Sequence, residues 1–238
     1  MIVTIHQPEH MPWLGFFHKI HMADVFVVLD NVQYRRRYFQ NRNKIRTKND
    51  SQWVTVPLKK ENRDELLIKD AEIFRGDTKW IIKNTDSIYH NYCAAPFFNT
   101  FWDAFKAIYS NEYQYLSELN MSLIQFIFDM LGMKKEIILA STLGVSGEKG
   151  DLIFNICKTI GTLRYVSGIS GRDYLDLGKF YRQGIEVVIQ EFHHPIYKQM
   201  YDPFMPCMSI IDLLFNHGDK SLDIINGVDV PVMEELFA

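Results

Sequence analysis

Hydrophobic positions in the first part of the chain change from strand-like runs to helical spacing and back. Residues 2–5 form a β-branched run that predicts a strand. After a loop with two prolines, apolar residues recur at the spacing of one helix face and predict a helix over 13–23. Residues 25–29 are apolar without a break and predict a buried strand. These elements form a βαβ unit, so we expect a parallel sheet with ligands at the carboxyl ends of its strands.

The rest of the chain has a helical middle followed by a second α/β part. Helical spacing predicts helices over 79–92, 98–109 and 113–131, and alternation predicts strands over 52–57 and 66–74. The 52–57 strand is the expected partner of the preceding segment in a small hairpin. After residue 132, strands and helices alternate again, over 136–140, 149–160, 164–166, 178–183, 185–190, 209–215 and 219–226. We therefore predict the α/β class, with a parallel Rossmann-like sheet and a small hairpin. The chain should form one domain over 1–238 with a helical insertion at about 79–132.

Composition and charge exclude several classes of protein. The 26 Lys and Arg against 29 Asp and Glu give a net charge of −3, which argues against a general nucleic-acid binder and against a DNA partner. No stretch approaches the roughly 20 apolar residues that cross a bilayer, so we expect no stable membrane insertion. Cys93, Cys157 and Cys207 are odd in number and far apart, and from the first residues we expect no signal peptide. A cytoplasmic location is the simplest expectation, and an oligomer is compatible with the sequence.

The loop after the first strand carries the first candidate chemistry. His6, Gln7 and His10 follow the strand at the place where a parallel sheet presents its ligand crevice. Either histidine is a candidate general base and Gln7 a candidate ligand-orienting residue. The alternative is that these side chains cap the next helix and hold the loop together. His18 and His21 are spaced for one helix face but have no third ligand nearby, so we expect no metal site.

A basic segment between residues 33 and 46 is the second candidate. It holds six cations with aromatic residues between them: Arg35, Arg36, Arg37, Arg42, Lys44 and Arg46, with Tyr34, Tyr38 and Phe39. Guanidinium groups match phosphate or carboxylate, and aromatic faces stack bases or sugars. We expect an anionic ligand here, a nucleotide or nucleotide sugar rather than a polymer. RNA, such as a tRNA acceptor end, is a further alternative, and a solvated basic hairpin is the structural one.

Two later loops also follow predicted strands. The first contains Ser167, Gly168, Ser170, Gly171, Arg172 and Tyr174. Its glycines allow close backbone approach and positive φ, and its hydroxyl and guanidinium groups suit a phosphate, although it lacks a Walker A ending. The alternative is a plain strand-to-helix turn capped by Asp173. In the second loop, His194 is a candidate acid–base group, with a structural histidine as the more ordinary reading.

In chain order, these segments resemble the WbqC-like family. The matching segments are 5–8, 12–20, 23–33, 41–45, 53–57, 165–168, 174–176 and 209–218. Ala94 stands where the resemblance leads us to expect a lysine, so a role for that lysine does not carry over. A second resemblance concerns HIGH-motif nucleotidyltransferases, since the loop between the first strand and the first helix ends at residues 10–13 with His10 at the first histidine position, and residues 167–172 match the place of their late Ser/Arg loop. Trp13 stands at the second histidine position of that motif.

The resemblance implies a role in surface-polysaccharide biosynthesis, in O-antigen or capsule gene clusters. It implies an aminoacyl, for example glycyl, or related acyl transferase that acts on the amine of a nucleotide-linked amino sugar. The donor would be an amino acid, either free with consumption of ATP and Mg²⁺ or supplied as aminoacyl-tRNA. The alternatives are a nucleotidyltransferase or ATP-dependent amide ligase of the HIGH-motif type, and a non-catalytic sugar-nucleotide-binding module.

Loops and resemblance together give one set of candidate site residues. The candidate catalytic residues are His6, His10 and His194. The candidate substrate-binding residues are Gln7, Trp13, Lys19, Asp30, Gln33, Arg35, Asn41, Arg42, Asn43, Lys44, Ser167, Gly168, Ser170, Gly171, Arg172 and Tyr174.

Overall fold

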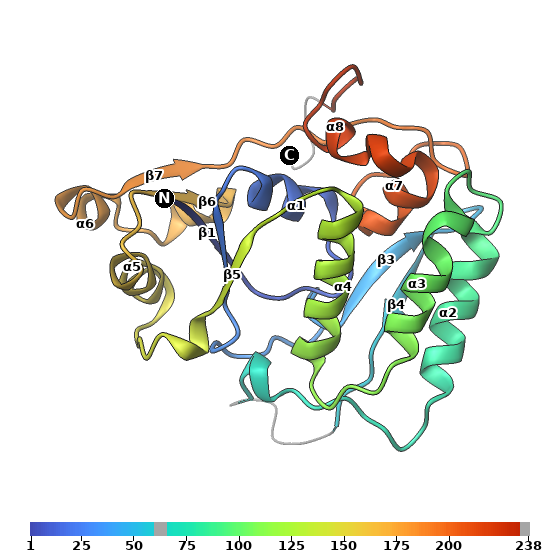
Figure 1. Ribbon diagram of the computed structural model, residues 1–238, viewed down its shortest axis with the longest axis horizontal. Helices are drawn as coiled ribbons and strands as arrows, with labels where there is room; N and C mark the ends of the chain where they lie inside the picture. The colour runs from blue at the N-terminus through green and yellow to red at the C-terminus, as the bar shows by residue number, and fades with distance from the viewer. Residues whose placement is uncertain (60–65, 234–238) are drawn as a thin grey trace. The chain divides into compact units, whose positions relative to one another are not determined.

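The computed structural model describes residues 1–59 and 66–233 (Figure 1). Its contacts divide the chain into two compact units, each assembled from separate segments. The sheet unit comprises Met1–Pro8, Gly15–Val32 and Lys134–Phe192. The hairpin unit comprises Glu9–Leu14, Gln33–Met133 and His193–Ala238. The chain therefore passes repeatedly between the two units.

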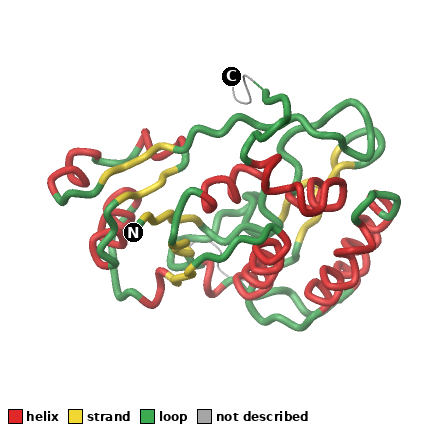
Figure 2. The backbone as a smooth tube through the Cα atoms, turned by 45° about the horizontal axis from the view of Figure 1, so that its top comes forward, coloured by secondary structure: helices red, strands yellow, loops and turns green. Residues whose placement is uncertain are grey.

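The sheet unit is built on five parallel strands, drawn in yellow in Figure 2. They are β1 (Ile2–His6), β2 (Val25–Val28), β5 (Glu136–Leu139), β6 (Arg164–Ser167) and β7 (Glu186–Ile189). Their order is β5-β2-β1-β6-β7, and every neighbouring pair is parallel. The predicted α/β class, parallel sheet and βαβ start are confirmed. The buried apolar run of β2 lies inside the sheet, as continuous apolar strands of parallel sheets do.

Helices pack on both faces of this sheet. Val3 and Val25 face a core completed by α5 (Lys149–Thr159) and α6 (Leu177–Arg182). Because successive strand residues point to opposite faces, Phe26 lies on the other side, where its ring centroid is 5.7 Å from that of Phe16 in α1 (Leu14–His21). The arrangement is a doubly wound sheet.

The hairpin unit combines an antiparallel pair with helices. Strands β3 (Arg42–Arg46) and β4 (Ser51–Thr55) pair in the register Lys44 opposite Trp53. Three long helices lie side by side next to them in Figure 1: α2 (Lys79–Tyr92), α3 (Phe98–Ser110) and α4 (Leu116–Met130). Two shorter helices follow near the end of the unit, α7 (Ile210–His217) and α8 (Ser221–Ile225). The predicted hairpin is confirmed, and its strand β4 is the one expected over 52–57.

The structure corrects two predicted elements in the hairpin unit. Residues 66–74 do not form a strand: a 3₁₀ turn (Ile68–Asp70) interrupts them, and only isolated bridges flank it. The helix expected from residue 113 begins at Leu116, because the Glu118 carboxylate accepts a 2.9 Å hydrogen bond from the backbone N–H of Tyr115 and caps the first turn. Its predicted stop is confirmed, since Gly132 adopts φ +65°.

No helix in the described part of the chain is both long enough and apolar enough to span a bilayer.

Candidate functional site

The strand order of the sheet unit creates a topological switch point. From β1 the chain first adds β2 and β5 on one side, and later adds β6 and β7 on the other. Ligands of open α/β sheets bind beyond the carboxyl ends of the two strands that flank such a point. Here those ends are His6 of β1 and Ser167 of β6, since the register pairs Thr4 with Val166. Sequence-predicted residues from two distant loops therefore meet at one sheet edge. We call His6, Gln7, Ser167 and Gly168 the switch-point residues.

His6 contacts an aromatic ring and feels the charge of a nearby cation. Its Nδ1 is 3.0 Å from the carbonyl oxygen of Gln7, and its ring meets Phe16 edge-on at 4.9 Å. Burial, reinforced by the charge of Lys19, lowers the pKa of His6 to about 3. The ring is therefore neutral at neutral pH. With the proton on Nδ1 directed to Gln7, Nε2 is the acceptor nitrogen.

Lys19 brings a positive charge to the same strand end. It is 4% exposed, and its Nζ donates a 3.2 Å hydrogen bond to the carbonyl oxygen of Ile5. A buried ammonium group at the end of β1 favours an anionic ligand at this edge.

Gln190 is a residue of this edge that the sequence analysis missed. It follows β7, and its backbone N–H donates to the carbonyl oxygen of Ser167 at 2.7 Å. Its side-chain amide donates to the carbonyl oxygen of Gly15 and to Nδ1 of His18, both at 2.9 Å. Gln190 thus ties α1 to the carboxyl end of β6. Its place as the last residue of a predicted strand was the signal that could have identified it.

Asp30 lies at the end of β2 and is 4% exposed. Its two carboxylate oxygens accept hydrogen bonds from the backbone N–H and the hydroxyl of Ser141, at 2.9 and 2.6 Å. The pair joins the ends of β2 and β5, so in this structure the carboxylate holds two strand ends together.

The Ser/Gly loop after β6 differs from its predicted form. Residues Ile169–Asp173 form a 3₁₀ turn, and neither Gly168 nor Gly171 has a positive φ. Glycine is required at position 171 because the Ser167 side chain lies too close for any other residue: a Cβ there would lie 2.0 Å from Oγ of Ser167. The cap of the next helix is Asp176 rather than Asp173. Among the candidate residues of the loop, Ser170, Arg172 and Tyr174 are exposed.

Replacing Gly171 with alanine is expected to destabilise the protein by about 1–3 kcal/mol, because the added methyl group would collide with the side chains of Ser167 and Leu175. Gly168→Ala is the matched control, since Gly168 has φ −68° and no atom within 4 Å of its Cβ position. Urea unfolding of both variants measures the difference. Equal stability of the two variants would contradict the packing role of Gly171.

His10 belongs to the hairpin unit and is completely buried there. Its Nδ1 donates to Oδ1 of Asn120 at 3.0 Å, and its Nε2 is 3.1 Å from the hydroxyl of Tyr109, which donates to it and accepts from Asn84 at 2.9 Å. Burial lowers the pKa of His10 to about 4, against the opposing effect of Asn120. The neutral ring links α3 and α4 to the loop that follows residue 9.

The third candidate histidine, His194, is also buried in the hairpin unit. Its Nδ1 is 2.8 Å from the carbonyl oxygen of Pro195, and its Nε2 accepts the backbone N–H of Cys207 at 3.1 Å. Trp13 stacks on its ring at 6.3 Å. The structure thus brings Trp13 and His194 together, and both belong to the hairpin unit.

The basic segment divides its residues between two faces of the hairpin. Asn41 and Asn43 are buried and donate to the carbonyl oxygens of Val56 and Met11, both at 2.8 Å. Arg42 and Lys44 lie on the outward face, over the ring of Trp53. Gln33 and Arg35 are exposed. The two asparagines fix the backbone on which the cations are displayed.

A buried carboxylate network in the hairpin unit was not predicted. Asp212 of α7 accepts hydrogen bonds from Tyr92, Tyr197 and Gln199 at 2.8–2.9 Å. Burial raises the pKa of Asp212, while these donors and the charge of Arg46 oppose the rise. Segment 209–218 carries this carboxylate, but the pattern of its sequence indicates only an amphipathic helix.

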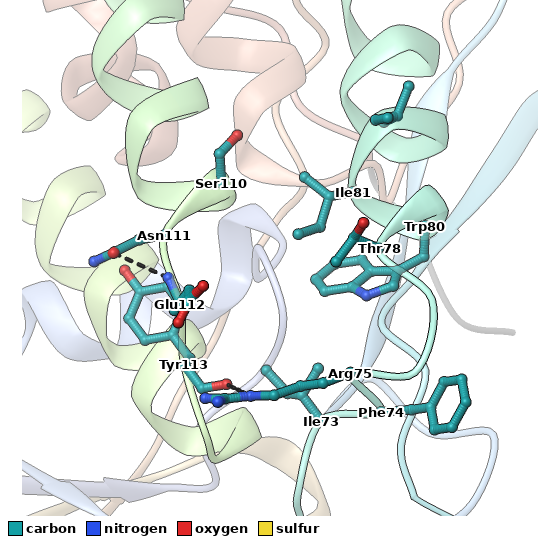
Figure 3. A pocket seen from close by; sticks show the side chains of 11 residues that line it. Ile73, Phe74, Arg75, Thr78, Trp80, Ile81, Ser110, Asn111, Glu112 and Tyr113 are labelled. Atoms are coloured by element: carbon teal, nitrogen blue, oxygen red, sulfur yellow. Dashed lines mark hydrogen bonds between the residues drawn. The ribbon is translucent and has the colours of Figure 1, made fainter.

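The hairpin unit also holds a cavity of about 400 Å³, shown in Figure 3. Trp80 and Ile81 of α2 form an apolar wall, while Arg75 and Glu112 bring charges of opposite sign. Nε of Arg75 donates to the carbonyl oxygen of Tyr113 at 3.1 Å, which fixes one rim. The volume of this cavity falls in the range of small-molecule binding sites. None of the sequence-predicted site residues lines it.

Within residues 1–59 and 66–233, no three His, Cys, Asp or Glu side chains are grouped closely enough to hold a metal ion. His18 and His21 lie on α1, and burial lowers the pKa of His18 to about 4.

Comparison with known proteins identifies relatives of the whole chain. The profile of the WbqC-like protein family matches residues 7–224. The uncharacterized protein Rv1507c of Mycobacterium tuberculosis (strain ATCC 25618 / H37Rv) is 33% identical over 225 residues, which cover 94% of this chain and 96% of that protein. No solved structure matches the chain.

Proposed function

The chain belongs to the WbqC-like protein family, and on that premise we propose that it is a transferase of surface-polysaccharide biosynthesis. It transfers an aminoacyl or related acyl group to the amine of a nucleotide-linked amino sugar. The observation that carries the proposal is the switch point of the sheet unit, where His6 and Ser167 end adjacent parallel strands. A small anionic ligand fits that edge of a doubly wound sheet.

The nucleotide phosphates provide the negative charge that this edge favours. Lys19 keeps its ammonium group buried at the end of β1, and its charge acts on His6. Backbone N–H groups after β6 and the hydroxyl of Ser170 supply hydrogen-bond donors, and Arg172 adds an exposed cation. These residues serve binding in the proposal.

Acyl transfer to an amine requires a base. The sugar ammonium must first lose a proton, after which its nitrogen attacks the acyl carbonyl carbon, the C–N bond forms, and the bond to the donor oxygen breaks. His6 takes the proton on Nε2. We assign this step to His6 rather than His10 because the ring of His10 is committed to Asn120 and Tyr109.

Ligand binding also tunes this base. Burial is the larger cause of the low pKa of His6 and the positive charge of Lys19 is the second. A bound phosphate next to Lys19 offsets that second cause, so the pKa of His6 rises towards the working pH when the nucleotide sugar is present.

The His6→Gln variant tests the assignment. Glutamine keeps a polar side chain of similar reach but cannot take up the proton, so we expect kcat to fall by about 10²–10⁴ with a much smaller change in KM. Turnover is measured as acylated sugar nucleotide formed from UDP-, GDP- or dTDP-linked amino sugars. The donor is glycine or another amino acid, either with ATP and Mg²⁺ or as aminoacyl-tRNA.

His193→Gln is the matched control, because His193 is exposed on a loop. It should keep wild-type turnover, and circular dichroism should show both variants folded. Wild-type turnover in His6→Gln would refute the base assignment. Release of pyrophosphate without an acylated sugar would refute the transferase and favour nucleotidyl transfer.

A further inference from the structure

The hairpin unit carries a basic stretch without a single carboxylate. Between Asp30 and Asp50, residues 31–49 contain seven Lys and Arg and no Asp or Glu. One of these cations, Arg46, is buried, and its guanidinium donates to the carbonyl oxygens of Thr47, Asp50 and Pro203. The remaining cations make this stretch locally positive, although the whole chain has a net charge of −3.

Three of these cations stand in one turn and face solvent. Arg35, Arg36 and Arg37 are all exposed, and none of them forms an ion pair in the part of the chain that the structure describes. Burial and the buried carboxylate of Glu9 raise the pKa of the nearby Tyr38 hydroxyl, while the charge of Arg35 opposes the rise. Because the three guanidinium groups are exposed to solvent, they are available to a polyanion.

Aromatic rings lie among these cations. On the outward face of the hairpin, Cζ of Arg42 is 4.1 Å and Nζ of Lys44 is 5.3 Å from the ring centroid of Trp53. Phe39 lies 6.0 Å from Trp53, and Tyr38 lies 5.5 Å from Phe39. The three rings are 36–43% exposed. Large aromatic side chains in this number at a basic surface indicate a ligand that stacks.

The backbone beneath these side chains is fixed. The carbonyl oxygen of Phe39 accepts the N–H of His10 at 2.9 Å, and Oε1 of Gln40 accepts the N–H of Arg35 at 2.7 Å. The Arg42 guanidinium donates to the carbonyl oxygen of Arg37 at 2.5 Å. A surface ordered in advance loses less entropy when a ligand binds.

We propose that this stacking face, formed by Tyr38, Phe39, Arg42, Lys44 and Trp53, binds single-stranded RNA. Resting on the proposed function, we further propose that this RNA is the acceptor end of an aminoacyl-tRNA, which supplies the acyl group. Unpaired bases stack on the rings, and phosphates contact Lys44 and the exposed arginines. The ester of this donor is already activated, so acyl transfer needs no ATP. The C–N bond forms as the ester C–O bond breaks, and the ribose oxygen leaves with a proton.

Binding of two RNA hairpins tests the proposal. Both carry the same paired stem, one has an unpaired 3′ CCA end, and the other is blunt. Stacking requires unpaired bases, so we expect the first to bind at least tenfold more tightly by fluorescence anisotropy. Equal affinity for the two would overturn the proposal, since charge alone would then account for binding.

The Trp53→Ala variant should weaken binding of the unpaired end by about 5- to 150-fold, and Trp53→Phe should recover most of the loss because it keeps a ring. Tyr181→Ala is the control, as Tyr181 is 84% exposed on α6 of the sheet unit. Equal loss in Tyr181→Ala, or no loss in Trp53→Ala, would overturn the stacking face. Thermal unfolding confirms that each variant is folded.

These measurements need no amino sugar and no turnover, so the two proposals fail separately. If the RNA does not bind but free amino acid and ATP give an acylated sugar, the RNA inference is wrong and the proposed transferase stands. If the unpaired end binds as described but no donor yields acylated sugar, the proposed transferase is wrong and the RNA face stands.

Discussion

Replacing Asp212 with alanine is expected to lower the free energy of unfolding by about 3–5 kcal/mol. The substitution removes the acceptor of three buried donors, the hydroxyls of Tyr92 and Tyr197 and the amide of Gln199. Each buried donor left without an acceptor costs about 1–3 kcal/mol. The three losses are not additive, because the remaining side chains shift towards one another.

The network reaches well beyond the carboxylate. The hydroxyl of Tyr92 also accepts the backbone N–H of Arg46 at 2.8 Å, and Gln199 exchanges two hydrogen bonds of 2.8 Å with the backbone of Met205. Asp212 therefore connects α2, α7, β3 and the loop after residue 196. Asp212→Asn should also destabilise, since its amide would offer a donor where the network needs an acceptor.

Urea unfolding measures this effect, with Asp86→Ala as the control. Asp86 is exposed on α2, so its loss should change stability by no more than about 0.5 kcal/mol. A cost of less than about 1 kcal/mol for Asp212→Ala would mean that the network contributes little to folding.

Acidification from pH 7 to pH 5 is expected to destabilise the protein strongly, with about 2 kcal/mol from each of His6 and His10. Burial lowers the pKa of these histidines to about 3 and about 4, against an ordinary value of 6.5. Below pH 6.5 the unfolded chain takes up protons that the folded protein does not, and each pH unit then costs about 1.4 kcal/mol per histidine.

The sign follows from which state binds more protons. A lowered folded-state pKa means that stability is full above pH 6.5 and falls as the pH drops towards the folded value. Burial lowers the pKa of His18, His21 and His194 as well, so these residues act in the same direction.

Urea unfolding at pH 5, 6 and 7 gives the slope of stability against pH. His10→Gln should be less stable at pH 7 because it loses its fit to Asn120 and Tyr109, but its slope should be shallower than that of the wild type. His193→Gln, at an exposed position, should keep the full slope. An unchanged slope in His10→Gln would show that His10 titrates normally in the folded protein.

The main elements of the fold could be predicted because each is encoded locally. The uninterrupted apolar run of β2 and the glycine that ends α4 are each recognisable from a few consecutive residues. Residues 66–74 have the composition of a strand but do not form one, because only isolated bridges pair this segment. The loops that follow the strands of the sheet unit could be predicted, but the order of the strands could not. The pairing of β1 with β6 joins segments that are far apart in the sequence.

The contacts of the candidate residues could not be predicted for the same reason. His10 meets Asn120 across 110 positions of sequence, and Asp212 meets Tyr92 across 120. Gly171 shows a different limit: of the two reasons expected for its glycine, the structure gives a close approach, to the Ser167 side chain, and no positive φ.

The division of the chain into two interleaved units has a consequence during synthesis on the ribosome. The chain changes unit after Pro8, Leu14, Val32, Met133 and Phe192. Strand β1 emerges first but gains β6 as its neighbour only after Ser167 has been made, so the nascent chain cannot complete the switch point early. Any truncation before β7 uncovers the edge of β6 that β7 pairs with in the complete sheet, and an uncovered inner strand is prone to aggregation. The protein should therefore be expressed and engineered as an uncut chain, because neither unit is a continuous fragment that could be cloned alone.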